Sequence, residues 1–356
     1  LRPLGLRLMK NRTLNCQLFF SKTNDFLSYY LPCQAARSIH TIETYRDGLT
    51  VFRRYMTNVQ KISIKKFLFT DCTSELMLDY LGYKDKICVV TGAASGMGKA
   101  TCEYLADLGA KVYAMDLAPI TVPAEKAIKM NLGDKASVDE AFSQLPDSID
   151  KFFGIAGVSG VTTDFATTIR INFIGHRYAL ENYIIPKLSE GGAIAFMGSL
   201  AGTGWQETRA ELMPVLEASG WDDAVEETGK IAKRAETKGY GKMIGVKGYF
   251  MSKRMMNLYV KKMAGPLAEK GIRINIICPG STETQLTSQW ASLMDAKSMQ
   301  GAQETRYAQP SEMAGPIIFA NSDMATYMSG QNIYIDFAQN AIQEYTNPDR
   351  EFPNIG

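Results

Sequence analysis

The stretch "KICVVTGAASGMGKATCEYLADLGA", residues 86–110, decides the fold. It opens with a short apolar, β-rich run that ends at a glycine turn, as a buried parallel strand does. Gly92, Gly96 and Gly98 follow in the spacing G-x-x-x-G-x-G, and a helical pattern continues from them. A strand, a tight glycine turn and a helix N-terminus together offer backbone N–H groups and the positive end of a helix dipole to a pyrophosphate. The stretch therefore predicts a dinucleotide-binding turn, with a plain strand-to-helix connection as the alternative.

A second predicted strand, "KVYAMD", ends at Asp116, roughly twenty residues after the glycine turn. A carboxylate at this place accepts hydrogen bonds from the hydroxyls of the adenosine ribose and repels a 2′-phosphate. Ser95 and Leu117 stand where an NADP site often carries a basic residue. We therefore expect NAD as the cofactor, with NADP less favoured.

The alternation of strands and helices continues along the chain and predicts an α/β fold, a Rossmann-type doubly wound parallel sheet with right-handed crossovers. Ligands of such sheets bind at the carboxyl ends of the strands. Asp116, Ser199 and Pro279-Gly280 all lie just past predicted strand ends, which places them at one edge. Further strands are expected at residues 127–130, 152–155, 193–197, 273–278 and 332–336, with helical patterns notably at 164–188 and 246–270.

Composition places the chain among ordinary globular proteins and divides it in two. Of its 356 residues, 46% are hydrophobic and 21% charged. Residues 1–83 hold 12 Lys and Arg against 6 Asp and Glu, a net charge of +6, whereas the remainder has 27 against 31, a net charge of −4. A basic first part and a mildly acidic body indicate two units of different origin, and the basic part favours a polyanion.

Several classes of site and location are disfavoured by residue counts. The 6 cysteines include no C-x-x-C pair and are expected to be reduced thiols of a cytoplasmic protein. With only 2 histidines, His40 and His176, a histidine-rich metal site is excluded, and we predict no metal. No apolar run approaches the length that spans a membrane, so no membrane partner is expected.

Acid–base chemistry is predicted for "GYFMSKRMM", in which Tyr249 and Lys253 lie one helical turn apart on the same face. A phenol titrates near 10, which is too high for a base at neutral pH. A cation one turn away stabilises the phenolate and brings its pKa toward the working range. The alternative is a surface Tyr-Lys pair, which is common on helices.

Ser199 and Asn172 strengthen the catalytic interpretation. Ser199 follows a predicted strand, where its hydroxyl can bond a carbonyl or a developing alkoxide. It is no hydrolase nucleophile, because Met197 and Ala201 occupy the positions that G-x-S-x-G gives to glycine. Asn172 is a polar residue in an apolar helical segment, either bonded to helix backbone or anchoring a water that leads from the lysine.

Residues 84–345 resemble a short-chain dehydrogenase/reductase in the turn T-G-x-x-x-G-x-G, in Asn172 and Ser199, and in Y-x-x-x-K from Tyr249 to Lys253. The resemblance implies that Tyr249 is the acid/base and that Lys253 lowers its pKa and holds the nicotinamide ribose. It also implies that Ser199 polarises the carbonyl, that Asn172 supports a proton relay and that the segment after Pro279 embraces the nicotinamide. The residues expected to bind the cofactor are Gly92, Ser95, Gly96, Met97, Gly98, Asp116, Leu117, Asn131, Leu132, Ala156, Gly157, Tyr249, Lys253, Pro279, Gly280, Thr282 and Thr284.

The sequence departs from the family pattern at three places. The usual N-N-A-G is replaced at residues 154–157 by G-I-A-G, and the usual D-G-G is replaced at residues 336–338 by D-F-A. A charged segment with a helical pattern, about residues 203–246, lengthens the path from Ser199 to Tyr249 far beyond the family's usual spacing. We expect it to be a helical insertion on the substrate side, with a solvated flap as the alternative.

The insertion, together with "CPGSTETQL" and "PSEMA", resembles the bacterial 3α-hydroxysteroid dehydrogenase/carbonyl reductase branch of the family. The implied substrates carry the 3-hydroxyl or 3-oxo group of steroids such as bile acids. Alternatives are a broad carbonyl reductase of xenobiotic or quinone carbonyls and, from another class, a non-catalytic NAD-sensing or DNA-associated protein. A homo-oligomer, a dimer, is expected. The candidate substrate-binding residues are Ser199, Trp205, Tyr249, Leu286 and Trp290, with Met294 beside them.

The chain divides into residues 1–23, a lead-in, residues 24–83, a helical segment, and the dehydrogenase-like residues 84–356. Within the second part, "SIHTIETYRDGLTVFRRYMTNVQ" has the apolar spacing of an amphipathic helix with arginines on its polar face. Residues 24–81 resemble the N-terminal core-binding domain of tyrosine recombinases, which has a small all-α, SAM-like fold. We expect this segment to be a vestigial fragment. Nonspecific DNA binding by residues 24–83 is the less favoured alternative.

Overall fold

The structure, a computed structural model, describes residues 80–291, 293 and 306–356, together with 50, 52–54, 56–58, 60–65 and 67. The chain forms two compact units, Leu1–Tyr80 and Leu81–Gly356. In the first unit the described residues include helical turns at 52–54 and 56–58, where Phe52 packs edge-to-face on Phe67 and on Tyr80. Most of residues 24–81 lie outside the described ranges, so their recombinase resemblance stays a prediction.

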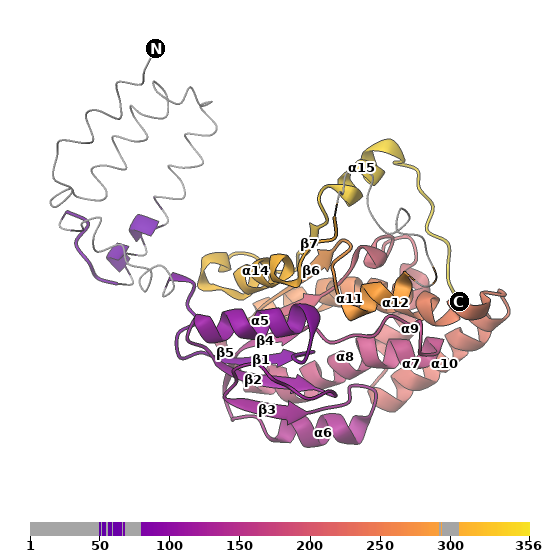
Figure 1. The fold of residues 1–356 in the computed structure, drawn as a ribbon, viewed down its shortest axis with the longest axis horizontal. Coiled ribbons are helices and arrows are strands. Elements are labelled where there is room, and N and C mark those ends of the chain that lie inside the picture. Colours follow the sequence, from indigo (N-terminus) through magenta and orange to yellow (C-terminus); the bar gives the residue numbers. More distant parts are fainter. Residues whose placement is uncertain are drawn as a thin grey trace, which may run out of the picture. The chain divides into compact units, whose positions relative to one another are not determined.

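The described residues of the second unit form a seven-stranded parallel sheet with the order β3-β2-β1-β4-β5-β6-β7 (Figure 1). The order confirms the predicted doubly wound α/β fold, because the chain moves outward from β1 to β3 and then returns to build the other half. The strands are β1 (Ile87–Thr91), β2 (Lys111–Asp116), β3 (Lys126–Lys129), β4 (Ile149–Gly154), β5 (Leu188–Met197), β6 (Arg273–Pro279) and β7 (Asn332–Ile335).

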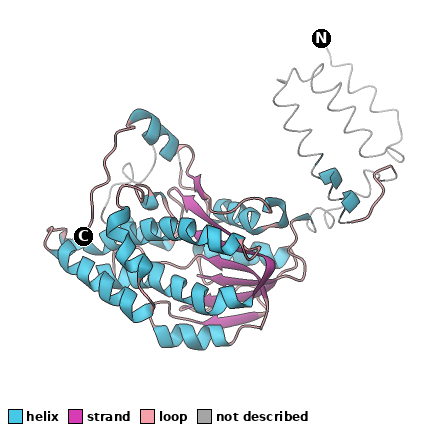
Figure 2. Ribbon diagram, turned by 180° about the vertical axis from the view of Figure 1, so that it is seen from behind, coloured by secondary structure: helices cyan, strands magenta, loops and turns pink. Residues whose placement is uncertain are grey.

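Helices cover both faces of the sheet (Figure 2). One face carries α5 (Gly96–Asp107) and α14 (Pro310–Asn321), and the other carries α6 (Lys135–Ser143), the long α11 (Ile244–Ala268) and the continuous helical run from α7 (Phe165–Ile169) through η4 (Arg170–Ile174), α8 (Gly175–Ala179), η5 (Leu180–Ile184) and η6 (Ile185–Lys187). Shorter helices are η7 (Leu200–Gly202), α12 (Gln285–Trp290), η9 (Asp323–Ala325) and α15 (Gln339–Thr346).

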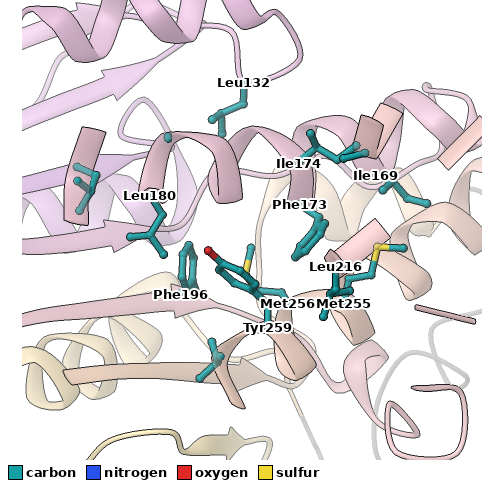
Figure 3. Packing of buried hydrophobic residues seen from close by; sticks show 14 of the residues in the cluster. Leu132, Ile169, Phe173, Ile174, Leu180, Phe196, Leu216, Met255, Met256 and Tyr259 are labelled. Atoms are coloured by element: carbon teal, nitrogen blue, oxygen red, sulfur yellow. The ribbon is translucent and has the colours of Figure 1, made fainter. Parts of the chain in front are cut away.

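The two faces bury separate apolar cores because successive strand residues point to opposite sides. In β1, Cys88 and Val90 join Leu105 of α5 in one core, whereas Val89 belongs to the other. On that second face Phe173 and Tyr259 meet edge-to-face with ring centroids 5.7 Å apart, between the helical run and α11 (Figure 3). Burial on both faces explains why the strands read as continuous apolar runs in the sequence.

The segment between Ser199 and Tyr249 is helical, as predicted, with α9 (Arg209–Glu217), α10 (Trp221–Glu236) and η8 (Gly241–Met243). It is no solvated flap. Leu212, Leu216 and Trp221 are buried in the core of the second face. The buried guanidinium of Arg177, on α8, donates to the Val215 and Ala218 carbonyls at 2.8 and 2.6 Å. The insertion is therefore an integral layer of the second unit.

The glycine turn brings three backbone segments into contact. Gly92 has φ +79°, in the left-handed region, and a Cβ there would lie 2.8 Å from the Cα of Ala156, after β4. A Cβ on Gly98, in the first turn of α5, would lie 2.0 Å from the Gly92 carbonyl oxygen. The helix therefore begins directly against the end of β1, at the carboxyl edge of the sheet.

A substitution at Gly98 tests this contact. Gly98→Ala places a methyl group against a backbone carbonyl, so we expect a loss of about 2–4 kcal/mol in the free energy of unfolding, measured by urea denaturation. The matched control is Gly229→Ala in α10, where a Cβ meets nothing within 4 Å. Because alanine is the better helix former, the control should gain up to about 1 kcal/mol. Equal effects at the two positions would contradict the close approach of α5 to β1.

Candidate active site

A cleft of about 560 Å³ opens at the carboxyl edge of the sheet. It extends from the glycine turn to the side chains predicted to be catalytic, so one cavity holds both halves of the predicted site. The predicted residues that line it are Gly92, Ser95, Gly96, Met97, Gly98, Asp116, Leu117, Asn131, Leu132, Ala156, Gly157, Ser199, Tyr249, Lys253, Pro279, Gly280, Thr282, Thr284, Leu286 and Trp290.

The glycine end of the cleft fits a dinucleotide. Ser95 precedes α5, whose first turn carries no acidic side chain, so nothing there opposes an anion at the helix N-terminus. The Asp116 carboxylate accepts hydrogen bonds from the backbone N–H groups of Ala94, at 3.0 Å, and Ala118, at 2.9 Å. These bonds fix the carboxylate beside the turn, and each oxygen keeps a lone pair for a ribose hydroxyl.

Asn172 lies behind the cleft wall rather than in it. It is buried in the π-helical turn η4, and π-turns within α-helices often occur at functional sites. Its amide oxygen accepts from the Val158 N–H at 2.8 Å, and its amide nitrogen donates to the Val158 carbonyl at 3.0 Å and to the Ser252 hydroxyl at 3.2 Å. The side chain thus positions the loop after β4 that forms one wall.

His176, one of the 2 histidines in the sequence, links the same loop to the glycine turn. The Thr91 hydroxyl oxygen accepts from the N–H groups of Ile155 and Ala156 and lies 3.1 Å from His176 Nε2. His176 Nδ1 lies 3.4 Å from the Asn172 carbonyl. Burial, aided by the Lys253 charge, lowers the pKa of His176 to about 3. The ring is therefore a neutral bridge, with Thr91 donating to Nε2 and Nδ1 donating to Asn172.

Ser199 and Tyr249 meet at the inner wall of the cleft. Ser199 follows β5 and its hydroxyl accepts from the Ala201 N–H at 3.1 Å. Burial raises the pKa of Tyr249 to about 12, and a hydrogen bond from Ser199 lowers it in part. The phenol pKa therefore lies above its ordinary value, whereas the resemblance implies a lowered one, because burial has the larger effect. At neutral pH the phenol is protonated and is poised to act as an acid.

Lys253 lies one turn after Tyr249 on α11, as predicted. Its Nζ lies 5.6 Å from the Tyr249 ring centroid and donates to the Met197 carbonyl at 2.7 Å. Burial lowers the pKa of Lys253 from 10.5 to about 8. The ammonium is therefore mostly charged at neutral pH, although it is buried without a carboxylate partner among the described residues.

The predicted substrate residues separate into two groups. The Trp290 ring meets Tyr249 edge-to-face, with centroids 4.7 Å apart, and stacks on Phe250 at 6.4 Å. Trp205 does not line the cleft, because it packs against the core of the second face. Met294 lies outside the described residues. The aromatic wall of the cleft is therefore made by Phe250 and Trp290.

Many residues that line the cleft were not predicted from the sequence, among them Phe250, Gln343 and Arg350. Phe250 follows Tyr249 directly in the sequence, which could have indicated it. Gln343 and Arg350 also line the cleft, yet they come from the chain after β7. No local pattern marks them, because their position depends on how that segment folds back.

The described residues hold neither a cluster suited to a metal ion nor a membrane-spanning helix. No group of 3 or more His, Cys, Asp or Glu side chains is arranged to hold a metal ion. No helix in these ranges is long and apolar enough to cross a membrane.

The profile of the short chain dehydrogenase family matches residues 86–210, and the profile described as enoyl-(acyl carrier protein) reductase matches residues 221–337. The chain belongs to the short-chain dehydrogenase/reductase family. It is accordingly an oxidoreductase of the kind that acts on CH–OH groups.

The relatives within the family are distant and diverse. The 3-alpha-hydroxysteroid dehydrogenase/carbonyl reductase of Comamonas testosteroni is 28% identical over 268 residues, covering 73% of this chain and 98% of its own. Coniferyl-alcohol dehydrogenase of a Pseudomonas strain is 26% identical, covering 71% and 95%. A crystal structure of 3-alpha-hydroxysteroid dehydrogenase from Pseudomonas sp. B-0831, complexed with NADH, superposes with a TM-score of 0.60 at 22% identity and covers 75% of this chain and all of its own. This last likeness shows the fold alone.

The buried ammonium should reduce stability. The pKa of Lys253 is about 8 in the folded protein and 10.5 in the unfolded chain. As long as the lysine is protonated, its buried charge therefore lowers the free energy of unfolding. We expect Lys253→Met to unfold at higher urea, with a gain of about 1–3 kcal/mol at pH 7. The gain should shrink as pH rises from 8 to 10.5, since the folded lysine then loses its charge. A variant less stable than the parent at pH 7 would contradict the pKa shift.

Proposed function

We propose that this protein is an NAD-dependent oxidoreductase that interconverts a secondary alcohol and a ketone, with the 3-hydroxyl or 3-oxo group of steroids as its first candidate substrate. The observation that carries the proposal is the convergence of Ser199, Tyr249 and Lys253 on the wall of a cleft whose other end is the glycine turn. A nicotinamide dinucleotide, when bound, supplies the hydride donor or acceptor.

The residues of the chain hold the substrate oxygen and move its proton. The Ser199 hydroxyl donates to the carbonyl oxygen and stabilises the negative charge that grows there during reduction. Tyr249 gives its Oη proton to that oxygen, and in oxidation it takes the proton back from the carbinol. The raised pKa of Tyr249, about 12, favours the acid role in the free protein. The Lys253 ammonium near the ring stabilises the phenolate left behind.

The preference for NAD rests on the end of β2. A 2′-phosphate would meet the Asp116 carboxylate and an apolar Leu117 that is 57% exposed, where a cation would be needed. The preference for a steroid rests on the flat aromatic wall of Phe250 and Trp290, and on the name of the relative from Comamonas testosteroni.

The proposal is tested by reduced-cofactor formation at 340 nm. The purified chain receives a 3α-hydroxy bile acid, its 3β epimer or a simple aromatic secondary alcohol, each with NAD or NADP. We expect turnover of a hydroxysteroid with NAD. Turnover of the aromatic alcohol alone would favour a broad carbonyl reductase, and cofactor binding without turnover of any alcohol would favour a non-catalytic NAD-binding protein.

The role of Tyr249 gives a sharper test in the same assay. Tyr249→Phe removes the hydroxyl that moves the proton, so kcat should fall by about a thousandfold while the melting temperature stays near that of the parent. Tyr104→Phe, at a residue on α5 that is 41% exposed, is the matched control and should keep full activity. A Tyr249→Phe protein with parental kcat would overturn the assigned chemistry.

A further inference from the structure

The segment from Arg350 to Gly356 is tied to the helical insertion. The Glu211 carboxylate on α9 accepts hydrogen bonds from the backbone N–H groups of Ile355, at 3.0 Å, and of Gly356. The Tyr240 hydroxyl donates to the Ile355 carbonyl at 3.0 Å, and the Ile355 side chain is buried. The insertion therefore fixes the path of this segment.

Phe352 orients two guanidinium groups. Its ring packs on Gly204, where a Cβ would lie 2.1 Å from Phe352 Cγ. The Arg254 and Arg350 guanidiniums lie 5.7 and 4.8 Å from the ring centroid, as cation–π partners. Arg254 donates to the Thr203 carbonyl at 3.2 Å and to the Pro353 carbonyl at 3.4 Å. Burial lowers the pKa of Arg254, the Glu211 carboxylate opposes this shift, and the Arg350 charge adds to it. Phe352 thus lies between two guanidiniums, of which only that of Arg350 belongs to a residue that lines the cleft.

Arg350 lines the cleft, and its guanidinium bonds Gln343, which lines it too. Its exposed neighbours in sequence, Asp349 and Glu351, do not line the cleft. The other charged lining residues are Asp116, at the adenosine end, and Lys253, whose ammonium donates to the Met197 carbonyl. The part of the cleft beside Arg350 is therefore positive.

The known partners of the Arg350 side chain are neutral. One of its terminal nitrogens donates to Gln343 Oε1 at 2.5 Å, and the guanidinium plane lies on Phe352. Among the described residues no carboxylate forms an ion pair with it, so N–H donors remain for a ligand. A planar guanidinium held in this way matches the geometry of a carboxylate.

We propose that Arg350 binds an anionic group of the substrate, a carboxylate, at a distance from the carbon that reacts. The proposal rests on the proposed function and narrows its substrate class to oxo and hydroxy acids. It also gives the insertion a role, which is to hold the segment that carries Arg350. The same cation could instead contact a cofactor phosphate, and the test separates the two sources.

The test compares two ketones that differ in one charge. Each is a 3-oxo-5β-steroid with the same side chain, ending in a carboxylate in one and in the corresponding primary alcohol in the other. Steady-state reduction is measured with the full chain, its Arg350→Ala and Arg350→Lys variants, and Arg209→Ala. Arg209 is an exposed arginine of the insertion that does not line the cleft and is the matched control.

We expect the parent protein to prefer the acid. In Arg350→Ala, kcat/KM for the acid should fall about tenfold, mainly through KM, while that for the alcohol stays within about twofold. Arg350→Lys should restore part of the loss, added salt should weaken the preference, and Arg209→Ala should match the parent. Equal kcat/KM for acid and alcohol, or an equal loss for both in Arg350→Ala, would overturn the inference. A rise confined to the cofactor KM would assign Arg350 to a cofactor phosphate and also overturn it.

Binding separates this inference from the proposed function. Trp290 lines the cleft, so quenching of tryptophan fluorescence by the two steroids reports binding without turnover. If neither ketone reacts but the acid binds tighter than the alcohol, and does so only with Arg350 present, the anion site stands and the steroid reaction falls. If the alcohol reacts but the acid neither binds nor reacts, the anion site falls and the steroid reaction stands. If neither steroid binds or reacts, both fall.

Discussion

The contact between α5 and the end of β1 is the constraint from which the rest of the site follows. Gly98 approaches the Gly92 carbonyl so closely that a Cβ would lie 2.0 Å from it, and Gly92 in turn faces the backbone of Ala156. The two glycines allow the three segments to converge because neither carries a side chain. Their convergence aims the N-terminus of α5 at the carboxyl edge of the sheet, where the other strand ends add Asp116 and Ser199.

On the other side of the cleft, two polar side chains are buried at a cost in stability. Tyr249 is protonated and Lys253 is charged at neutral pH, and both are removed from water on α11. Apolar side chains at these two positions would stabilise the fold more. Nearby, Asn172 and His176 use their hydrogen bonds to position backbone segments around the cleft. Sites of this kind are where stability is given up for function.

Much of the fold could be predicted from the sequence, because the signals are local. The strands read as apolar runs ended by glycine or acidic residues, and the helix expected at 246–270 is α11, residues 244–268. Residues that line the cleft were predictable for the same reason where they follow a strand end or lie one helical turn from another, whereas their roles in cofactor binding and catalysis stay predictions. The direction of a side chain could not be predicted in this way. Trp205 follows Ser199 closely in the sequence, yet it packs against the core.

Properties that depend on long-range packing could not be predicted at all. Burial sets the pKa of Tyr249 near 12, and no pattern around the tyrosine shows how much water it has lost. Arg350 reaches the cleft only because the chain beyond it is bound by Glu211 and Tyr240 of the insertion. The insertion, which the sequence shows only as a charged helical segment, therefore helps to define the site.

The most direct measurement of the central claim follows one hydrogen atom. An alcohol that the chain oxidises is prepared with deuterium at its carbinol carbon, and the reduced nicotinamide is analysed by mass spectrometry after a single turnover. Transfer between neighbours in one cleft predicts one deuterium on each reduced nicotinamide and an equal amount of ketone. Reduced nicotinamide without the label, or ketone formed without reduced nicotinamide, would contradict the account.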